Sequence, residues 1–455
     1  MAFLSLGLFL MVLFHGCTAQ FSPHQNQWQA LGGAQRHRLQ ARTSCDIDRI
    51  SAREPNRRFS AEAGETEIWD LENEEFLCAG FVAIRYTIQP RGLLLPSYTN
   101  APQISYVIRG KGIQGAVIPG CAETFESSQE SGFPDRHQKV REIRQGDVLS
   151  VFPGMTTWAF NNGENPLELI SLLDLSNDAN QLDLKIRKFF LAGNPSAARG
   201  EERHGAQTKE AGNVFKGIDE KFLSAIFNVD VDTARKLKGD EDNRGNIVRV
   251  EKNFEVVCPS YQGEEAEMRE RRHNGLEETV CTMKLSQNID SARRADVYNP
   301  RGGRLTTLNS HHFPALNTIQ LSAERGVLYR NAILAPYWNV NAHSMVYILR
   351  GSGRMQIVGS KGTVFDEQVK EGQIVVVPQD FASIKKASQD GLEWIAFKTS
   401  ANAMTSPIAG RLSVFRGLPV DVLMNSYGIS REEARNMKFN REGLKVFGPG
   451  SATRS

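Results

Sequence analysis

The sequence predicts a mainly β protein, built from two tandem β-barrel units that are each followed by a helical segment. Three observations support this fold class. Short apolar segments of strand length recur about every eight to twelve residues, the hydrophobic period then becomes helical, and the same order returns later in the chain. The 455 residues suffice for two or three domains, and a hydrophobic content of 40% is ordinary for a globular protein.

The first unit begins near Cys45 and reads as a series of short strands. Turn signals such as Pro90-Arg91-Gly92 and Gly110-Lys111-Gly112 separate them. The predicted strands are residues 81–88, 104–108, 115–118, 148–152 and 167–173. Strands of this length and spacing are typical of a β-sandwich or a barrel.

The hydrophobic period changes between residues 218 and 238. Apolar residues there follow helical spacing, with a break predicted near Asn228. The apolar face of this segment is a candidate for contact with another copy of the chain. The alternative is that it packs on its own barrel.

The same order of elements recurs in the second half. The strand 104–108 and its Gly-rich turn match residues 345–349 and Arg350-Gly351-Ser352-Gly353, so that Tyr106 falls on Tyr347. The strand after Gly146 matches the strand after Gly372, and the helical segment matches residues 418–438. Three matched blocks in one order indicate a tandem duplication.

The N-terminus predicts a secretory signal peptide over residues 1–19. An apolar run from Phe3 to Phe14 is followed by small residues up to Ala19, and it is too short to span a membrane. Disulfides form in the secretory pathway. The predicted mature chain has five cysteines, so at most two bridges form within one chain.

Charge divides the chain at Asn274-Gly275. From Gly275 onward there are 22 Lys and Arg against 15 Asp and Glu, and before it 32 against 37. The whole chain carries only +2, which predicts no general attraction to nucleic acid or to a membrane surface. An isolated Asn-Gly is most often a hairpin turn, but the charged run 262–273 before this one is not a strand.

These features together resemble a known family. Two barrel units closed by helices, with a Gly-rich turn after a barrel strand, resemble a bicupin with two jelly-roll barrels. The stretch Asn274-Gly275-Leu276-Glu277-Glu278-Thr279-Val280-Cys281 is similar to the processing site of the 11S globulins (legumins), the seed storage proteins of plants. The resemblance covers essentially the whole mature chain.

The resemblance implies a non-catalytic nutrient reservoir, held in the protein storage vacuole of a seed and degraded on germination. It implies self-association into trimers and then hexamers, and storage globulins resemble known allergens as a class. An asparaginyl endopeptidase would cut between Asn274 and Gly275. The acidic chain 20–274 would hold the first cupin unit (about 45–240), and the basic chain 275–455 the second (about 285–445).

The family pattern also implies two disulfides. One bridge, Cys45–Cys78, would lie within the acidic chain, and the other, Cys121–Cys281, would join the two chains. Cys258 has no place in this pattern, and its apolar neighbours favour a buried thiol.

Metal-binding cupins hold their ion with histidines and a carboxylate in the barrel, because imidazole and carboxylate suit Mn, Fe and Zn. The eight matching positions here are Pro96, Tyr98, Gln103, Thr157, Tyr337, Asn339, Ser344 and Ser383. None is a His, Asp or Glu, so we expect no metal, no cofactor and no cupin catalysis. Two alternatives stay open: a metal-dependent bicupin enzyme of the oxalate type, and a vicilin-type storage or carbohydrate-binding bicupin. A small-ligand pocket in a barrel is also open.

Overall fold

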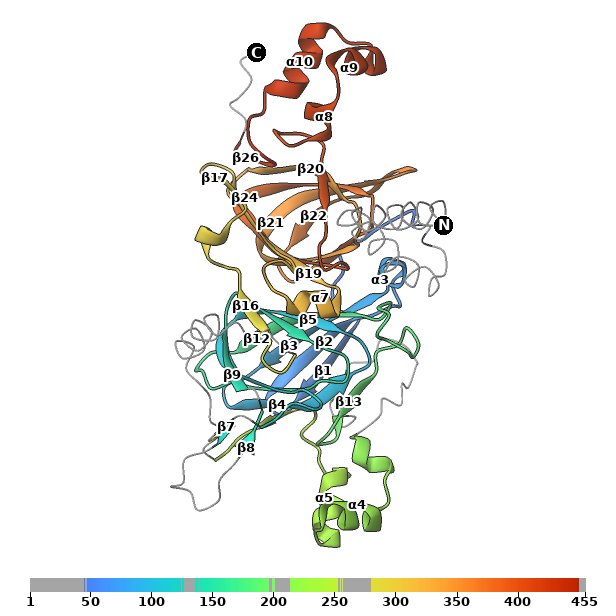
Figure 1. Ribbon diagram of the computed structural model, residues 1–455, viewed down its shortest axis with the longest axis vertical. Coiled ribbons are helices and arrows are strands. Elements are labelled where there is room, and N and C mark those ends of the chain that lie inside the picture. Colours follow the sequence, from blue (N-terminus) through green and yellow to red (C-terminus); the bar gives the residue numbers. More distant parts are fainter. Residues whose placement is uncertain are drawn as a thin grey trace, which may run out of the picture.

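The computed structural model describes residues 45, 47–123, 125–126, 136–138, 140–195, 199–200, 213–252, 254, 256 and 280–449. The predicted signal peptide, the Asn274-Gly275 site and Cys258 lie outside these residues. Two β units are stacked along the long axis of the molecule, and a helical extension projects from each end (Figure 1). This arrangement confirms the predicted fold class.

The first unit consists of two antiparallel sheets. The larger sheet has the strand order β14-β1-β2-β3-β12-β5-β10-β16, and the smaller has the order β13-β4-β11-β6-β9 with β15 beside β4. These strands, with the separate β7–β8 pair, are β1 (Arg57–Ala61), β2 (Gly64–Trp69), β3 (Phe81–Ile88), β4 (Gly92–Thr99), β5 (Gln103–Arg109), β6 (Lys111–Val117), β7 (Phe125–Glu126), β8 (Arg136–His137), β9 (Val140–Arg144), β10 (Asp147–Val151), β11 (Thr156–Phe160), β12 (Leu167–Asp174), β13 (Lys188–Phe190), β14 (Arg199–Gly200), β15 (Ile247–Arg249) and β16 (Ser286–Asn288).

The second unit is built on one ten-stranded sheet. Its strand order is β17-β18-β19-β24-β20-β25, and β21 pairs with β22, β23 and β24. The strands are β17 (Val297–Asn299), β18 (Gly303–Leu308), β19 (Ser322–Leu328), β20 (Ile333–Asn339), β21 (Ser344–Gly359), β22 (Gly362–Lys370), β23 (Ile374–Val377), β24 (Ala382–Lys398), β25 (Thr405–Pro407) and β26 (Val446–Phe447). The helices of the whole chain are α3 (Glu74–Ala79), η3 (Val214–Gly217), α4 (Glu220–Phe227), α5 (Val231–Lys238), η4 (Ala292–Arg294), α7 (Ala315–Ile319), α8 (Val414–Gly417), α9 (Val420–Tyr427) and α10 (Arg431–Phe439).

The predicted Gly-rich turn differs between the two units. In the first unit Gly110 makes the bend with φ +85, and β6 begins at once at Lys111, four residues before the strand predicted at 115–118. In the second unit the prediction of a turn is wrong, because β21 runs through Gly351 as one strand with a bulge. Gly351 has φ +76, and a Cβ there would lie 2.3 Å from the carbonyl oxygen of Gly391, so only glycine fits this bulge.

The central strands are apolar on both faces. In β3, Val82 and Ile84 point into the first barrel, whereas Phe81 and Ala83 pack against the second unit. β5, β12 and β21 follow the same rule, whereas β19 and β24 add buried charged residues to their apolar ones. Their inter-unit faces form one core of thirty buried residues that both units share. Strands buried on both sides read as continuous apolar runs, which explains why β3 alternates only partly.

Each unit also completes a sheet of the other. Residues 286–288 form β16, which pairs with β10 at the edge of the first unit. In the opposite direction, Arg53 pairs with Ile374, and the Ile50 amide donates to the carbonyl oxygen of Val364 at 2.9 Å. These reciprocal strand contacts cover edges that would otherwise be open to solvent.

Two polar contacts cross the shared core at matching positions of the repeat. Arg85 Nη1 donates to the hydroxyl of Tyr347 at 2.9 Å. Tyr106 donates to Asp290 Oδ1 at 3.0 Å, and Arg325 Nε donates to the same oxygen at 2.9 Å. Burial raises the pKa of both tyrosines, so both remain protonated donors or acceptors at neutral pH. The predicted equivalence of Tyr106 and Tyr347 is confirmed.

The helical extensions confirm the predicted break. Asn228 ends α4 in the left-handed conformation, with φ +52, and Gly428 ends α9 in the same way. The side chain of Asp230 then caps α5 by accepting from the Thr233 amide at 2.7 Å. Ser430 does the same for α10 through a capping box with Glu433.

Replacing Arg325 with Met should destabilise the protein by about 3–5 kcal/mol, because it leaves the carboxylates of Asp290 and Glu393 partly buried without their cation. Denaturant unfolding would measure this. The matched control is Arg354→Met, which breaks a solvent-exposed pair with Asp366 and should leave the unfolding midpoint unchanged. Equal effects of the two substitutions would contradict a structural role for the buried contact.

Candidate functional site

The metal-ligand positions of the two barrels hold no His, Asp or Glu. Tyr98, Gln103 and Thr157 line a cavity in the first barrel. In the second barrel the matching positions, Tyr337, Asn339, Ser344 and Ser383, are all buried. Within the described part of the chain, no group of three or more His, Cys, Asp and Glu residues could hold a metal ion.

The second barrel instead contains a buried charge cluster. Lys398 Nζ donates to Asn339 Oδ1 at 2.8 Å and lies 3.6 Å from Glu324 Oε2. Lys445 Nζ lies 3.9 Å from the same carboxylate oxygen, and the ammonium groups of Lys385 and Lys398 each lie 5.4 Å from the centre of the Tyr337 ring. The fixed positive charge of these lysines occupies the region in which other cupins hold a cation, and it repels one.

The charges in this cluster depend on one another. Burial lowers the pKa of Lys385 to about 8, although Glu324 opposes the shift. Burial alone would raise the pKa of Glu324, but the neighbouring lysines lower it to about 2. Within the part of the chain that the structure describes, the Lys385 ammonium has no hydrogen-bond partner. This cluster was not predicted from the sequence, although lysines at 385 and 398 inside an apolar segment are a usable signal.

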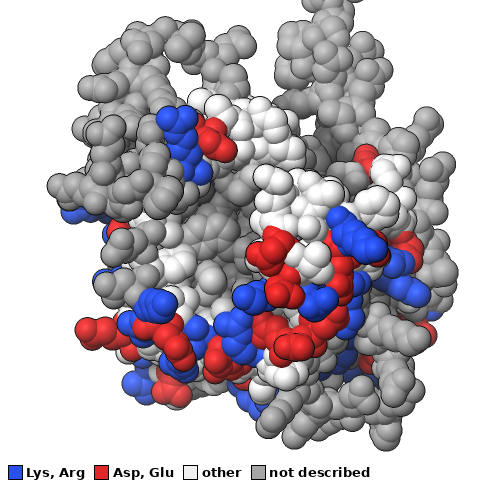
Figure 2. All heavy atoms as spheres, turned by 90° about the horizontal axis from the view of Figure 1, so that it is seen from below, with Lys and Arg blue, Asp and Glu red and all other residues white. Residues whose placement is uncertain are grey.

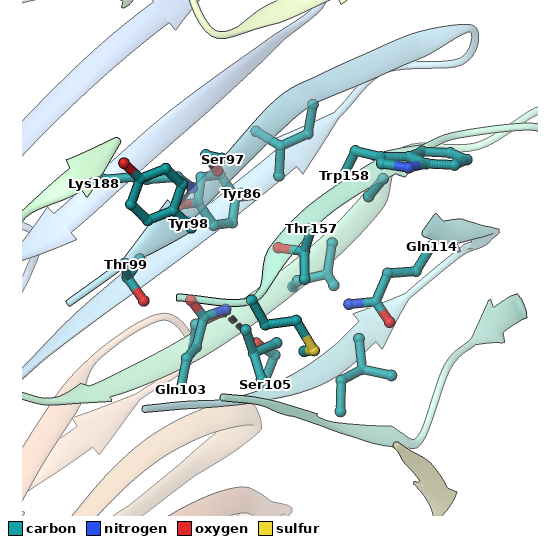
Figure 3. A pocket seen from close by; sticks show the side chains of 17 residues that line it. Tyr86, Ser97, Tyr98, Thr99, Gln103, Ser105, Gln114, Thr157, Trp158 and Lys188 are labelled. Atoms are coloured by element: carbon teal, nitrogen blue, oxygen red, sulfur yellow. Dashed lines mark hydrogen bonds between the residues drawn. The ribbon is translucent and has the colours of Figure 1, made fainter. Parts of the chain in front are cut away.

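The first barrel has apolar residues at the positions where the second barrel has this charge cluster. Strand pairing places Ile84, Ala159 and Leu173 where the second barrel has Glu324, Lys385 and Lys398. Its polar groups lie beside the cavity, where Gln103 Nε2 donates to Ser105 Oγ at 2.8 Å and to Ser171 Oγ at 3.2 Å (Figure 3). The two barrels therefore share a backbone design and differ in interior chemistry.

The cysteine pairs in the structure are those that the family resemblance implies. Cys45 is bonded to Cys78, and Cys121 is bonded to Cys281. The second bridge joins residues on opposite sides of Asn274-Gly275, which itself lies outside the described residues. A cut there would leave the two chains covalently linked.

The helical extensions expose large apolar side chains. Leu223 and Ala234 are buried between the helices, whereas Phe222 and Ile226 are 68% and 69% exposed. At the other end Leu423 and Ala434 are buried in the same way, and the exposed side chains are Leu412, Val422, Tyr427, Met437 and Phe439. Both extensions project away from the barrels (Figure 1), so packing on their own barrels does not cover these surfaces. Exposed apolar surfaces of this kind mark protein–protein contacts.

Charge does not identify a nucleic-acid surface on the end of the molecule that carries α4 and α5. Figure 2 shows that acidic and basic side chains are interleaved on this face. Among the described residues, no helix has both the length and the apolar character that crossing a bilayer would require.

Replacing Lys385 with Met should stabilise the protein at pH 7 by on the order of 2 kcal/mol, because the desolvation cost of the buried ammonium outweighs its attraction to Glu324. The folded-state pKa of about 8 lies below the unfolded value of 10.5, so the unfolded chain binds more protons between these pH values. The parent protein therefore gains stability as the pH rises through this window, and the difference from the variant shrinks.

Urea unfolding at pH 7 and pH 10 would test this. The exposed neighbour Lys386 provides the control, because Lys386→Met should change neither value. A Lys385→Met variant that is less stable than the parent at pH 7 would show that the ammonium has a favourable partner.

Comparison with known proteins agrees with this geometry. Residues 50–197 and 287–435 match the family model described as Cupin. The 11S globulin subunit beta of Cucurbita maxima is 47% identical, and the alignment covers 97% of each chain. Cocosin 1 of Cocos nucifera is 46% identical over 99% of this chain and 98% of its own length. The crystal structure of pumpkin seed globulin superposes with a TM-score of 0.81, at 47% identity, over 90% of this chain and all of that one.

These similarities extend over nearly the whole length of the chain and favour neither a metal-dependent enzyme nor a vicilin-type protein. They agree with two stacked barrels, two helical extensions and metal-ligand positions that hold no ligand. The chain belongs to the cupin family and, within it, to the 11S globulins, which are seed storage proteins.

Proposed function

We propose that this protein is a non-catalytic nutrient reservoir of the seed, stored in the protein storage vacuole and degraded on germination. The interior of the second barrel supports a non-catalytic role. There Lys398 and Asn339 fill the region that corresponds to a cupin metal site. Storage requires dense packing of many copies rather than a reactive site, so assembly surfaces are the functional surfaces of this chain.

Assembly proceeds first to a trimer. The exposed apolar faces of α4 and α9 lie at opposite ends of the molecule (Figure 1). In the proposed trimer each of these faces meets the barrel end of the next copy in a head-to-tail contact. A head-to-tail contact is heterologous and closes into a ring when the rotation between copies is right. The two extensions have the same layout, which supports this proposal. Phe227 packs on Phe215 in one extension, and Tyr427 packs on Phe415 in the other.

Processing follows assembly. An asparaginyl endopeptidase cuts between Asn274 and Gly275, giving an acidic chain 20–274 and a basic chain 275–455 after removal of residues 1–19. The Cys121–Cys281 bridge supports processing without loss of a product, because it keeps both chains in one particle. The cut gives the charged run 262–274 a free chain end, which allows two trimers to stack as a hexamer.

Replacing both Phe222 and Ile226 with Ser should weaken trimer formation by about 3 kcal/mol per interface, or a hundredfold in Kd. Both side chains are mostly exposed in the single chain, so the fold should survive. Light scattering across a dilution series would measure the effect. Leu182→Ser is the control, because Leu182 is 60% exposed in a loop remote from the extensions. A double variant that assembles like the parent would contradict the assignment of the surface.

Replacing Asn274 with Ala should leave one uncut chain that forms trimers but not hexamers. A denaturing gel with reductant and a native mass measurement would report both properties. Asn162→Ala is the matched control, because Asn162-Gly163 is a second Asn-Gly pair and lies between β11 and β12. Hexamers of uncut Asn274→Ala protein would overturn the proposed link between cutting and stacking.

A further inference from the structure

The first barrel contains a partly open cavity that the storage function does not use. It lies between the two sheets of the first unit and has a volume of about 40 Å³. On one side it is lined by apolar side chains such as Leu149 and Leu169, and on the other by amides and hydroxyls. Figure 3 shows Gln103, Gln114 and Thr157 facing this space from β5, β6 and β11.

The side chain of Gln114 is the first feature that indicates a ligand site in the cavity. Its side chain is 8% exposed, and its amide makes no hydrogen bond within the described part of the chain. The Thr157 hydroxyl also has no partner there. Both polar groups therefore face the cavity with hydrogen-bonding capacity that the described residues do not use. In the second barrel the position of Gln114 is occupied by Met355, which has no such requirement, so the fold does not demand an amide here.

The charge of the side chains that line the cavity determines which class of ligand it favours. Among the described residues that line the cavity, Lys188 is the only charged one, and none is an Asp, Glu or His. Its ammonium donates to the Tyr86 hydroxyl at 2.5 Å and lies 4.6 Å from the centre of the Tyr86 ring. An ammonium has three donors, so two remain for another acceptor. A cavity with one cation, no anion and unpaired donors suits an anionic acceptor and disfavours a cation.

We propose that the first barrel binds a short aliphatic monocarboxylate, with its carboxylate on Lys188 and with Gln114 and Thr157 as further hydrogen-bond partners. The volume has room for about three water-sized groups, which corresponds to roughly the size of acetate or glycolate. The apolar side of the cavity receives the carbon atoms. This site goes beyond the reservoir function and does not depend on it.

Titration of the full-length protein with acetate at constant ionic strength, followed by ligand-observed NMR, tests the proposal. Acetate should bind saturably, with one site per chain. Lys188→Met should weaken binding at least tenfold, because it removes a charge-assisted hydrogen bond. Gln114→Met should weaken it severalfold and should fold, because the second barrel has methionine at this place. Circular dichroism of both variants checks that the barrel is intact.

Two controls make the result specific. Lys385→Met removes the unpaired ammonium of the second barrel and should leave acetate binding unchanged. Glycerol, a neutral molecule of similar size, should bind at least tenfold more weakly than acetate. The proposal is overturned if acetate shows no saturable binding, if Lys188→Met binds it like the parent, if glycerol binds equally well, or if Lys385→Met abolishes binding.

Discussion

The apolar face shared by the two barrels is the constraint on which the rest of the structure depends. It contains thirty buried residues from both halves of the chain, among them Tyr106, Tyr347 and Phe397. A strand that supplies this face must also line its own barrel, so both of its faces are buried. The shared core is reinforced at its edges, where β16 joins the first unit and residue 53 joins the second. The two halves therefore form one folded unit, which should stay assembled after the chain is cut between them.

The duplicated barrels differ most where the shared face does not constrain them. The outward sides of β5 and β21 keep the same tyrosine at Tyr106 and Tyr347, and each meets an arginine of the other unit. The barrel interiors differ at three matching positions, with Glu324, Lys385 and Lys398 in one barrel and Ile84, Ala159 and Leu173 in the other. One barrel therefore holds charge that excludes a metal cation, and the other holds a small neutral cavity with a single ammonium at its side.

Sequence patterns predicted those parts of the fold that local chemistry determines. The helical period and the left-handed residue at Asn228 are local, and the repeat of Tyr106 at Tyr347 needed only comparison of the halves. The exchange of β16 could not be predicted, because Ser286-Gln287-Asn288 is short, polar and without alternation, and only the edge of β10 makes it a strand. The charge cluster was also missed, because Glu324 reads as a surface residue until the barrel closes around it.

The most direct test of this account is the native mass of the protein after it has been cut at Asn274 and its disulfides have been reduced, without denaturant. If the shared core and the exchanged strands hold the halves together, the acidic and basic chains will elute together in equal amounts, as one assembly with no free chain of either kind. If the chains separate as soon as the Cys121–Cys281 bridge is reduced, the bridge and not the shared core holds the molecule together, and the account is contradicted.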